Sequence, residues 1–140
     1  MFVVELVGEG ARGVLVQTYH GLAMRLTGCS FAERLEHGGD LEADLATLIP
    51  RACELLEGRA EVPGIAPDVL RDRLLAGYRH ILVDEYQDID ADQYRLISAL
   101  AGRTREEARL TLLAVGDDDQ SIYGFRGANV EYIHRFRQDY

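Results

Sequence analysis

The sequence contains no lysine: all 15 of its basic residues are arginine. Phosphate-binding P-loops need a lysine that reaches the β- and γ-phosphates of a nucleotide, in the pattern G-x-x-x-x-G-K-[ST], so this chain holds no P-loop. Schiff-base chemistry on a lysine amine is excluded for the same reason. The net charge of -9 argues against a surface that attracts nucleic acid uniformly. Any contact with DNA or RNA must therefore be local.

Cysteine and long apolar runs are also scarce. Cys29 and Cys53 are too few for a disulfide framework, and their spacing is not that of metal ligands. Because the longest apolar runs are only a few residues, no membrane-spanning helix is expected. The N-terminus lacks the basic start and long apolar region of a signal peptide. These absences predict a protein of the reducing cytoplasm.

What is present is typical of one folded domain that carries at most a small insertion. The chain has 140 residues, of which 47% are hydrophobic and 28% are charged. A folded chain of this length buries roughly 70% of its unfolded surface. The composition therefore predicts a globular protein with a real core and excludes a disordered tail.

Apolar periodicity indicates alternating strands and helices. Two β-rich runs, 1–6 and 14–18, are expected to form strands. From Tyr19 onward, apolar residues recur at intervals of three and four, which predicts a helix that ends at Gly28. The elements expected later are a buried strand at 80–84, a helix from about 90, a buried strand at 110–115 ended by Gly116, and a helix from 129 to 140 with Ile133 and Phe136 inward. This order predicts an α/β sheet protein.

A helical and acidic stretch from 31 to about 77 separates the two parts of the predicted sheet. Its apolar stripe begins at Leu41 and continues beyond Pro50. A loop is expected at 61–67, and Asp68 is expected to cap the helix that follows. We interpret this stretch as a helical insertion.

The first group of chemistry-bearing residues lies at 81–88, where an apolar strand ends in Asp84 and Glu85. Carboxylates at the carboxyl end of a strand lie in the crevice where open α/β sheets bind ligands. One carboxylate can hold Mg²⁺, and its neighbour can orient or deprotonate an attacking water. The structural alternative is that the two acids begin the next helix, where negative charge favours the positive end of the helix dipole.

The second group, at 115–128, follows the next predicted strand and lies at the same edge of the sheet. Gln120 can reach a ligand held at Asp84 from this edge, and it can contact a phosphate oxygen or a water without adding charge. An arginine beside two aromatic rings forms a platform for unpaired bases, with stacking worth ~1–3 kcal/mol per base. The residues of this platform are Tyr123, Phe125 and Arg126. The structural alternative is a polar turn followed by aromatic residues of the core.

Taken together, the two groups resemble motifs of the UvrD/Rep-type superfamily 1 DNA helicases. Residues 84–88, Asp-Glu-Tyr-Gln-Asp, match the Walker B motif of that family. Residues 115–128 match its third motif, including the Gly-Asp, Gln-Ser-Ile-Tyr and Phe-Arg-Gly-Ala elements. Residues 18–23 are similar, over a shorter stretch, to its Thr-Phe-His-Ser element.

The resemblance implies a partial RecA-like P-loop NTPase fold, with a parallel sheet, flanking helices and a short helical insertion. Residues 1–30 and 78–140 would form part of motor domain 1A, and 31–77 a shortened 1B-like insertion. ATP and Mg²⁺ would be the cofactors of the complete motor.

The resemblance also implies roles for individual residues. Asp84 would help to hold Mg²⁺, and Glu85 would activate the water that attacks the γ-phosphate of ATP. Gln87 and Gln120 would couple the nucleotide to the DNA path, Gln120 by contacting the γ-phosphate. The residues implied to contact single-stranded DNA are Thr18, His20, Tyr123, Phe125 and Arg126.

The chain matches only a middle slice of the family's motor, because the lysine-bearing Walker A segment and the later arginine motifs are absent. We therefore predict a segment of an ATP-dependent 3′–5′ DNA helicase that is inactive alone and works with the remaining helicase domains on single-stranded DNA. One alternative is a non-catalytic truncated relative that binds single-stranded DNA or a protein partner. Another is a metal-dependent nuclease or phosphatase built on Asp84, Glu85, Asp88 and the cluster Asp117–Asp119. Exposed sheet edges would also allow homo-oligomers.

Overall fold

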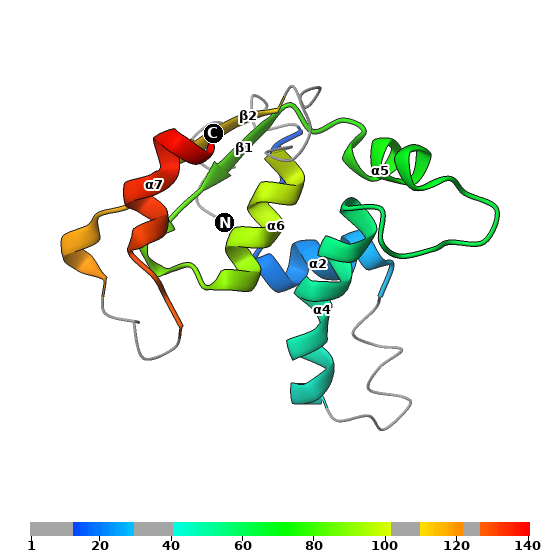
Figure 1. Cartoon of the computed structure of the whole chain (residues 1–140), viewed down its shortest axis with the longest axis horizontal. Coiled ribbons are helices and arrows are strands. Elements are labelled where there is room, and N and C mark those ends of the chain that lie inside the picture. Colours follow the sequence, from blue (N-terminus) through cyan, green and yellow to red (C-terminus); the bar gives the residue numbers. More distant parts are fainter. Residues whose placement is uncertain (1–12, 30–40, 102–109, 122–126) are drawn as a thin grey trace.

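A parallel β-α-β unit forms the centre of the protein in the computed structural model, which describes residues 13–29, 41–101, 110–121 and 127–140 (Figure 1). Strand β1 (His80–Val83) pairs with β2 (Thr111–Ala114), and their register places His80 beside Thr111 and Val83 beside Ala114. Helix α6 (Ala91–Ala101) lies between them in the sequence. The predicted α/β class, both of these strands and the helix near residue 90 are therefore confirmed.

The remaining helices surround this unit. Helix α2 (Tyr19–Thr27) ends at Gly28 in the left-handed conformation, as the sequence predicts. Three further helices are described, and two single-turn 3-10 helices follow the strands. They are α4 (Leu41–Leu56), α5 (Pro67–Leu75), α7 (Glu131–Asp139), η2 (Tyr86–Asp88) and η3 (Asp118–Gln120). Among the described residues, no helix has both the length and the apolar character that crossing a bilayer requires.

The predicted strand at 14–18 is wrong. Residues 14–17 form no strand, and Val14 and Val16 are well exposed. The cause is that β propensity reflects a fit to neighbouring strands, and the described sheet consists of β1 and β2 alone. The strand predicted at 1–6 lies outside the described residues.

Strands β1 and β2 were predicted to be buried, and this prediction is wrong for one face of each strand. Leu82 and Leu113, which are register partners, are 72% and 52% exposed. Ile81 and Leu112, on the other face, pack against the core. An apolar run marks a strand but does not say how many of its faces are covered.

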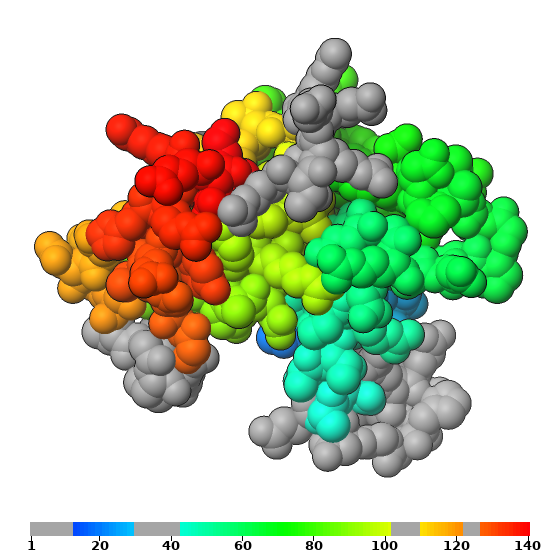
Figure 2. Space-filling view, viewed as in Figure 1, coloured from blue at the N-terminus to red at the C-terminus, as the bar shows by residue number. Residues whose placement is uncertain are grey.

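The main core joins α2, α4 and α6. Its fully or almost fully buried members are Ala23, Leu26, Leu48, Ile49, Ala52, Cys53, Leu56, Leu96, Ala99 and Leu100. Pro50 lies inside α4, and the helix continues through it because apolar residues on both sides of the proline are anchored in this core. A second cluster, around Tyr86, joins the sheet to α7 through Ile133 and Phe136, so the inward placement predicted for these two residues is confirmed. On the face shown in Figure 2, α6 lies between α4 and α7.

The first turns of α6 and α5 are stabilised by different residues. Asp90 and Gln93 form a reciprocal cap at the start of α6: Asp90 Oδ1 accepts from the Gln93 amide at 2.9 Å, and Gln93 Oε1 accepts from the Asp90 amide at 3.3 Å. The cap predicted at Asp68 is wrong, because α5 begins one residue earlier, at Pro67. Proline is favoured at the first helical position, which leaves Asp68 in the first turn.

A bidentate ion pair ties the end of α4 to α6. Arg95 donates from Nε to Glu57 Oε1 at 3.0 Å and from Nη2 to Glu57 Oε2 at 2.6 Å. These hydrogen bonds hold the pKa of the Glu57 carboxyl below its usual value, against the opposing effect of burial. The pair therefore stabilises the folded chain whenever Glu57 is ionised.

Replacing Glu57 with Gln is expected to lower the free energy of unfolding by about 1 kcal/mol at pH 7. The folded-state pKa is depressed, so this contribution is fully present above the carboxyl's ordinary pKa of about 4.3 and is lost as the pH falls through the lowered value. Urea unfolding at a series of pH values measures the difference. Glu54→Gln, on an exposed face of α4, is the control, and an equal loss in both variants would contradict the prediction.

Candidate functional site

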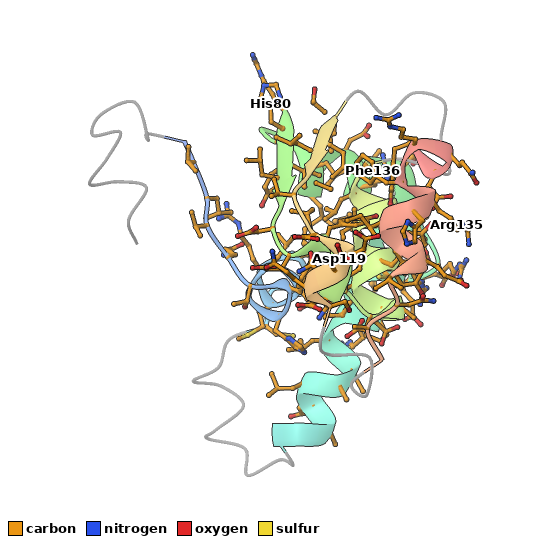
Figure 3. The ribbon with its side chains drawn as sticks, turned by 90° about the vertical axis from the view of Figure 1, so that its left-hand side faces the viewer. His80, Asp119, Arg135 and Phe136 are labelled. Carbon is orange, nitrogen blue, oxygen red and sulfur yellow. The ribbon has the colours of Figure 1, made fainter. Side chains whose placement is uncertain are left out.

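The carboxyl ends of β1 and β2 bring the two predicted groups together. Beyond the strands, the Val115 amide donates to the Val83 carbonyl at 2.8 Å, and the Tyr86 amide donates to the Val115 carbonyl at 2.9 Å. The segments that begin at Asp84 and at Gly116 therefore leave the sheet side by side. His80, at the start of β1, and Asp119, in η3, lie at opposite ends of the sheet (Figure 3).

Asp84 and Glu85 form a sharp turn directly after β1. The Glu85 amide donates to Asp84 Oδ1 at 3.0 Å, and both residues are exposed. Among the described residues, Glu85 is the one non-glycine residue in the left-handed region, with a φ of 52°. Such a conformation costs of order 1–3 kcal/mol and is concentrated at functional sites.

The structural alternative for this pair is not supported. The α-helix that follows begins at Ala91, and its first turn is capped by Asp90 instead of by Asp84 or Glu85. Glu85 stands at the N-cap position of the single turn of η2, but its side chain makes no capping bond to it. Neither carboxylate therefore caps a helix.

Gln87 is buried at this point, with 1% of its surface exposed. Its Nε2 donates to Glu85 Oε2 at 2.6 Å, and its Oε1 accepts from the Asp117 backbone amide at 3.0 Å. The side chain thus bridges the ends of the two strands. The motif match assigned Gln87 to nucleotide coupling, but it gave no sign that this side chain is buried.

The second segment turns immediately into η3. Asp117 Oδ1 accepts from the Asp119 amide at 3.1 Å, and Asp117 Oδ2 accepts from Gln120 Nε2 at 2.7 Å. Gln120 is exposed, as a residue that contacts a ligand must be. The sequence assigned Asp117 only to the nuclease or phosphatase alternative, and the structure shows that it fixes the turn that presents Gln120.

Tyr19 is a second residue that the sequence did not single out for this site. Its ring packs against both clusters, and its buried hydroxyl has no hydrogen-bond partner among the residues that the structure describes. Burial, reinforced by the carboxylates of Asp90 and Asp84, raises its pKa. The start of α2 therefore packs against the cluster that contains Val83, at the carboxyl end of β1.

The other predicted site residues are only partly accounted for. Thr18 is the N-cap of α2, where its Oγ1 accepts from the Gly21 amide at 3.1 Å, and His20 is exposed in the first turn of the helix. Tyr123, Phe125 and Arg126, predicted to bind DNA, lie outside the described residues. Within the part of the chain that the structure describes, no three His, Cys, Asp or Glu side chains are grouped to hold a metal ion. The described acids therefore give no support to a nuclease site with several metal ligands.

Comparison with known proteins gives the family. A family model described as the UvrD/REP helicase N-terminal domain matches residues 15–140. The chain therefore belongs to the UvrD/REP helicase N-terminal domain family.

Similar curated proteins are DNA helicases. The chain is 43% identical over 97 residues to DNA helicase II of Haemophilus influenzae and 44% identical over 100 residues to DNA helicase II of Escherichia coli. Each alignment covers 69% of this chain and 12% of the relative. It is also 47% identical over 75 residues to the ATP-dependent DNA helicase PcrA of Leuconostoc citreum, covering 54% of this chain and 9% of that protein. No solved structure matches the chain.

Proposed function

We propose that this chain supplies two parts of an ATP-dependent 3′–5′ DNA helicase motor. The first is the half of the ATP site that holds Mg²⁺ and activates water. The second is the loop that couples this site to single-stranded DNA. The whole sheet would be RecA-like, with 1–30 and 78–140 in the motor domain and 31–77 as its insertion. The remaining helicase domains would supply the rest of the machinery.

The observation that carries the proposal is the convergence of the two motif segments at the carboxyl ends of paired parallel strands. Ligands bind open α/β sheets at this edge. Asp84 and Glu85 from one strand end are joined there, through buried Gln87, to the turn that presents Gln120 from the other. The relatives include a protein named as an ATP-dependent DNA helicase, which supports ATP as the ligand.

Asp84 fits the role of a magnesium ligand. It is exposed, and among the described residues its Oδ2 makes no hydrogen bond, while Oδ1 is oriented by the Glu85 amide. Mg²⁺ is usually bound through one or two carboxylates together with waters and substrate phosphates, so a single protein carboxylate is enough. When bound, the ion supplies positive charge that offsets the phosphate oxygens.

The contacts of Glu85 support a role as the acceptor of a proton from water. Its left-handed backbone turns it away from the strand, and the hydrogen bond from Gln87 Nε2 engages Oε2, which fixes the carboxylate and leaves Oε1 to receive a proton. Gln120, held by Asp117, would contact the γ-phosphate. His20, Tyr123, Phe125 and Arg126 would follow the DNA strand, together with Thr18.

The purified chain is expected to show no ATP hydrolysis above background, because it has no lysine or other basic group assigned to the β- and γ-phosphates. A chimera in which this chain replaces the aligned segment of the Escherichia coli DNA helicase II is expected to hydrolyse ATP and to be stimulated by single-stranded DNA. Phosphate release with and without DNA measures both results.

The controls separate a lost site from a lost fold. Asp84→Asn in the chimera should abolish the magnesium-dependent turnover, whereas Asp72→Asn, at an exposed position of α5, should not. Clear Mg²⁺-ATP hydrolysis by the pure chain would overturn the proposal that it holds only one half of the ATP site, the part formed by Asp84 and Glu85, which we call the half-site. A folded chimera that binds neither ATP nor DNA would overturn the proposed function as a whole.

A further inference from the structure

We infer that Gln87 and Asp117 are positioning residues that join Glu85 to Gln120 through one continuous chain of hydrogen bonds. The inference rests on the proposed function, because it gives the water-activating and phosphate-sensing residues of that function a direct physical link. We call Glu85, Gln87, Asp117 and Gln120 the strand-end link.

The strand-end link has three steps. Gln87 Nε2 donates to Glu85 Oε2 at 2.6 Å. Gln87 Oε1 accepts from the Asp117 backbone amide at 3.0 Å. Asp117 Oδ2 then accepts from Gln120 Nε2 at 2.7 Å. The link therefore begins at the end of β1 and finishes in η3, after β2.

The centre of the link, Gln87, is buried, and the other three members are exposed. Gln87 is 1% exposed, and a hydrogen bond shielded from water is stronger than one in water. Glu85 and Gln120 are both exposed. This is the arrangement expected of a connection between two groups that meet a ligand, because a purely structural network would bury its ends as well.

The link requires a side chain at position 87 that both donates and accepts a hydrogen bond. A primary amide donates from one end and accepts at the other, and the link uses both functions. Glutamate of the same shape keeps the acceptor but places a negative charge against Glu85. Methionine keeps the volume and loses both hydrogen bonds.

Gly116 makes room for the link. A Cβ atom at this position would lie 2.5 Å from Gln87 Oε1 and 3.1 Å from the Gln87 and Tyr86 amide nitrogens. The glycine at the end of β2 therefore allows the amide of Gln87 to approach the second strand closely.

The test uses the full 140-residue chain labelled for nuclear magnetic resonance. In Gln87→Met, hydrogen exchange at the Asp117 amide should accelerate by roughly tenfold, the effect of losing one buried hydrogen bond, and the side-chain amide signal of Gln120 should shift. In Gln87→Glu, the Asp117 amide should stay protected while the carboxyl signal of Glu85 moves. Gln138→Met, at an exposed position of α7, is the control and should change none of these signals.

Coupling along the link is tested by a double-mutant comparison. Glu85→Ala should shift the side-chain amide of Gln120 in the wild-type background and leave it unchanged in the Gln87→Met background. Asp117→Ala should release Gln120 and leave the bond between Gln87 and Glu85 intact, which provides a second variant if Gln87→Met does not fold. Equal shifts of Gln120 in both backgrounds would overturn the inference.

These readouts need no nucleotide, so they fail separately from the proposed function. If the chain shows the coupling but the helicase chimera does not bind Mg²⁺-ATP, the strand-end link stands and the proposed ATP site does not. A response of Glu85 and Gln120 to Mg²⁺-ATP that is the same in wild type and in Gln87→Met would keep the half-site and overturn the link.

Discussion

Glu85→Gln is expected to lower ATP turnover by at least about a hundredfold in the helicase chimera, while ATP binding changes little. The substitution keeps the shape of the side chain and an oxygen that can accept the hydrogen bond from Gln87 Nε2. It removes the carboxylate that takes a proton from the attacking water. Because the lost interaction belongs to the transition state, kcat should fall far more than KM rises.

Steady-state phosphate release and equilibrium binding of ATP measure the two quantities separately. Glu131→Gln, in the exposed first turn of α7, removes the same charge outside the site and should leave kcat unchanged. A loss of ATP binding equal to the loss of turnover would show that Glu85 contributes to binding instead of to chemistry. Unchanged turnover would remove Glu85 from the reaction.

The strand ends could be predicted from the sequence because each carries a local signal. The run from Ile81 to Val83 is apolar and stops at two acids, and the run from Leu112 to Val115 stops at Gly116. Parallel strands joined by a helix must present their carboxyl ends at one edge of a sheet, so the segments that begin at Asp84 and at Gly116 had to leave the sheet at the same edge. The structure agrees with this prediction through β1, α6 and β2.

The hydrogen bonds between these segments could not be predicted. The three bonds that run from Glu85 to Gln120 depend on the side-chain direction of Gln87, on the register of β1 with β2 and on the left-handed turn at Glu85. None of these has a periodic signal. Glu85 is a residue type that seldom adopts a positive φ, so the sequence predicts its place at the strand end but gives no sign of its left-handed backbone.

The error at 14–18 has a different origin. Residues 14–16 are all apolar, but a strand exists only where a partner strand supplies hydrogen bonds, and single-sequence patterns do not report partners. The exposed face of the sheet has the same cause. Leu82 and Leu113 have the composition of a covered face and are nevertheless open among the described residues. Apolar periodicity shows which face of a segment can be buried, but it does not show whether another element covers that face.

The stretch predicted as a helical insertion, 31–77, shares a hydrophobic core with helices outside it. Leu48 lies in α4, inside the stretch at 31–77, and is fully buried against residues of α2 and α6. If this stretch were an independent unit, a cavity at Leu48 would unfold it alone. Because α4 shares one core with helices from both sides of it in the sequence, the cavity should destabilise the described fold as a single cooperative unit.

Leu48→Ala is accordingly expected to lower the free energy of unfolding by about 2–5 kcal/mol, the range for removing a buried leucine side chain. Urea unfolding followed by circular dichroism and by tyrosine fluorescence should give coincident transitions that shift together, because Tyr19 of α2 packs against the same core. Leu82→Ala, whose side chain is 72% exposed in β1, is the matched control and should cost less than about 1 kcal/mol. Two separated transitions in Leu48→Ala would show instead that the insertion folds by itself, and the division of the chain at 31–77 would then be one of stability as well as of sequence.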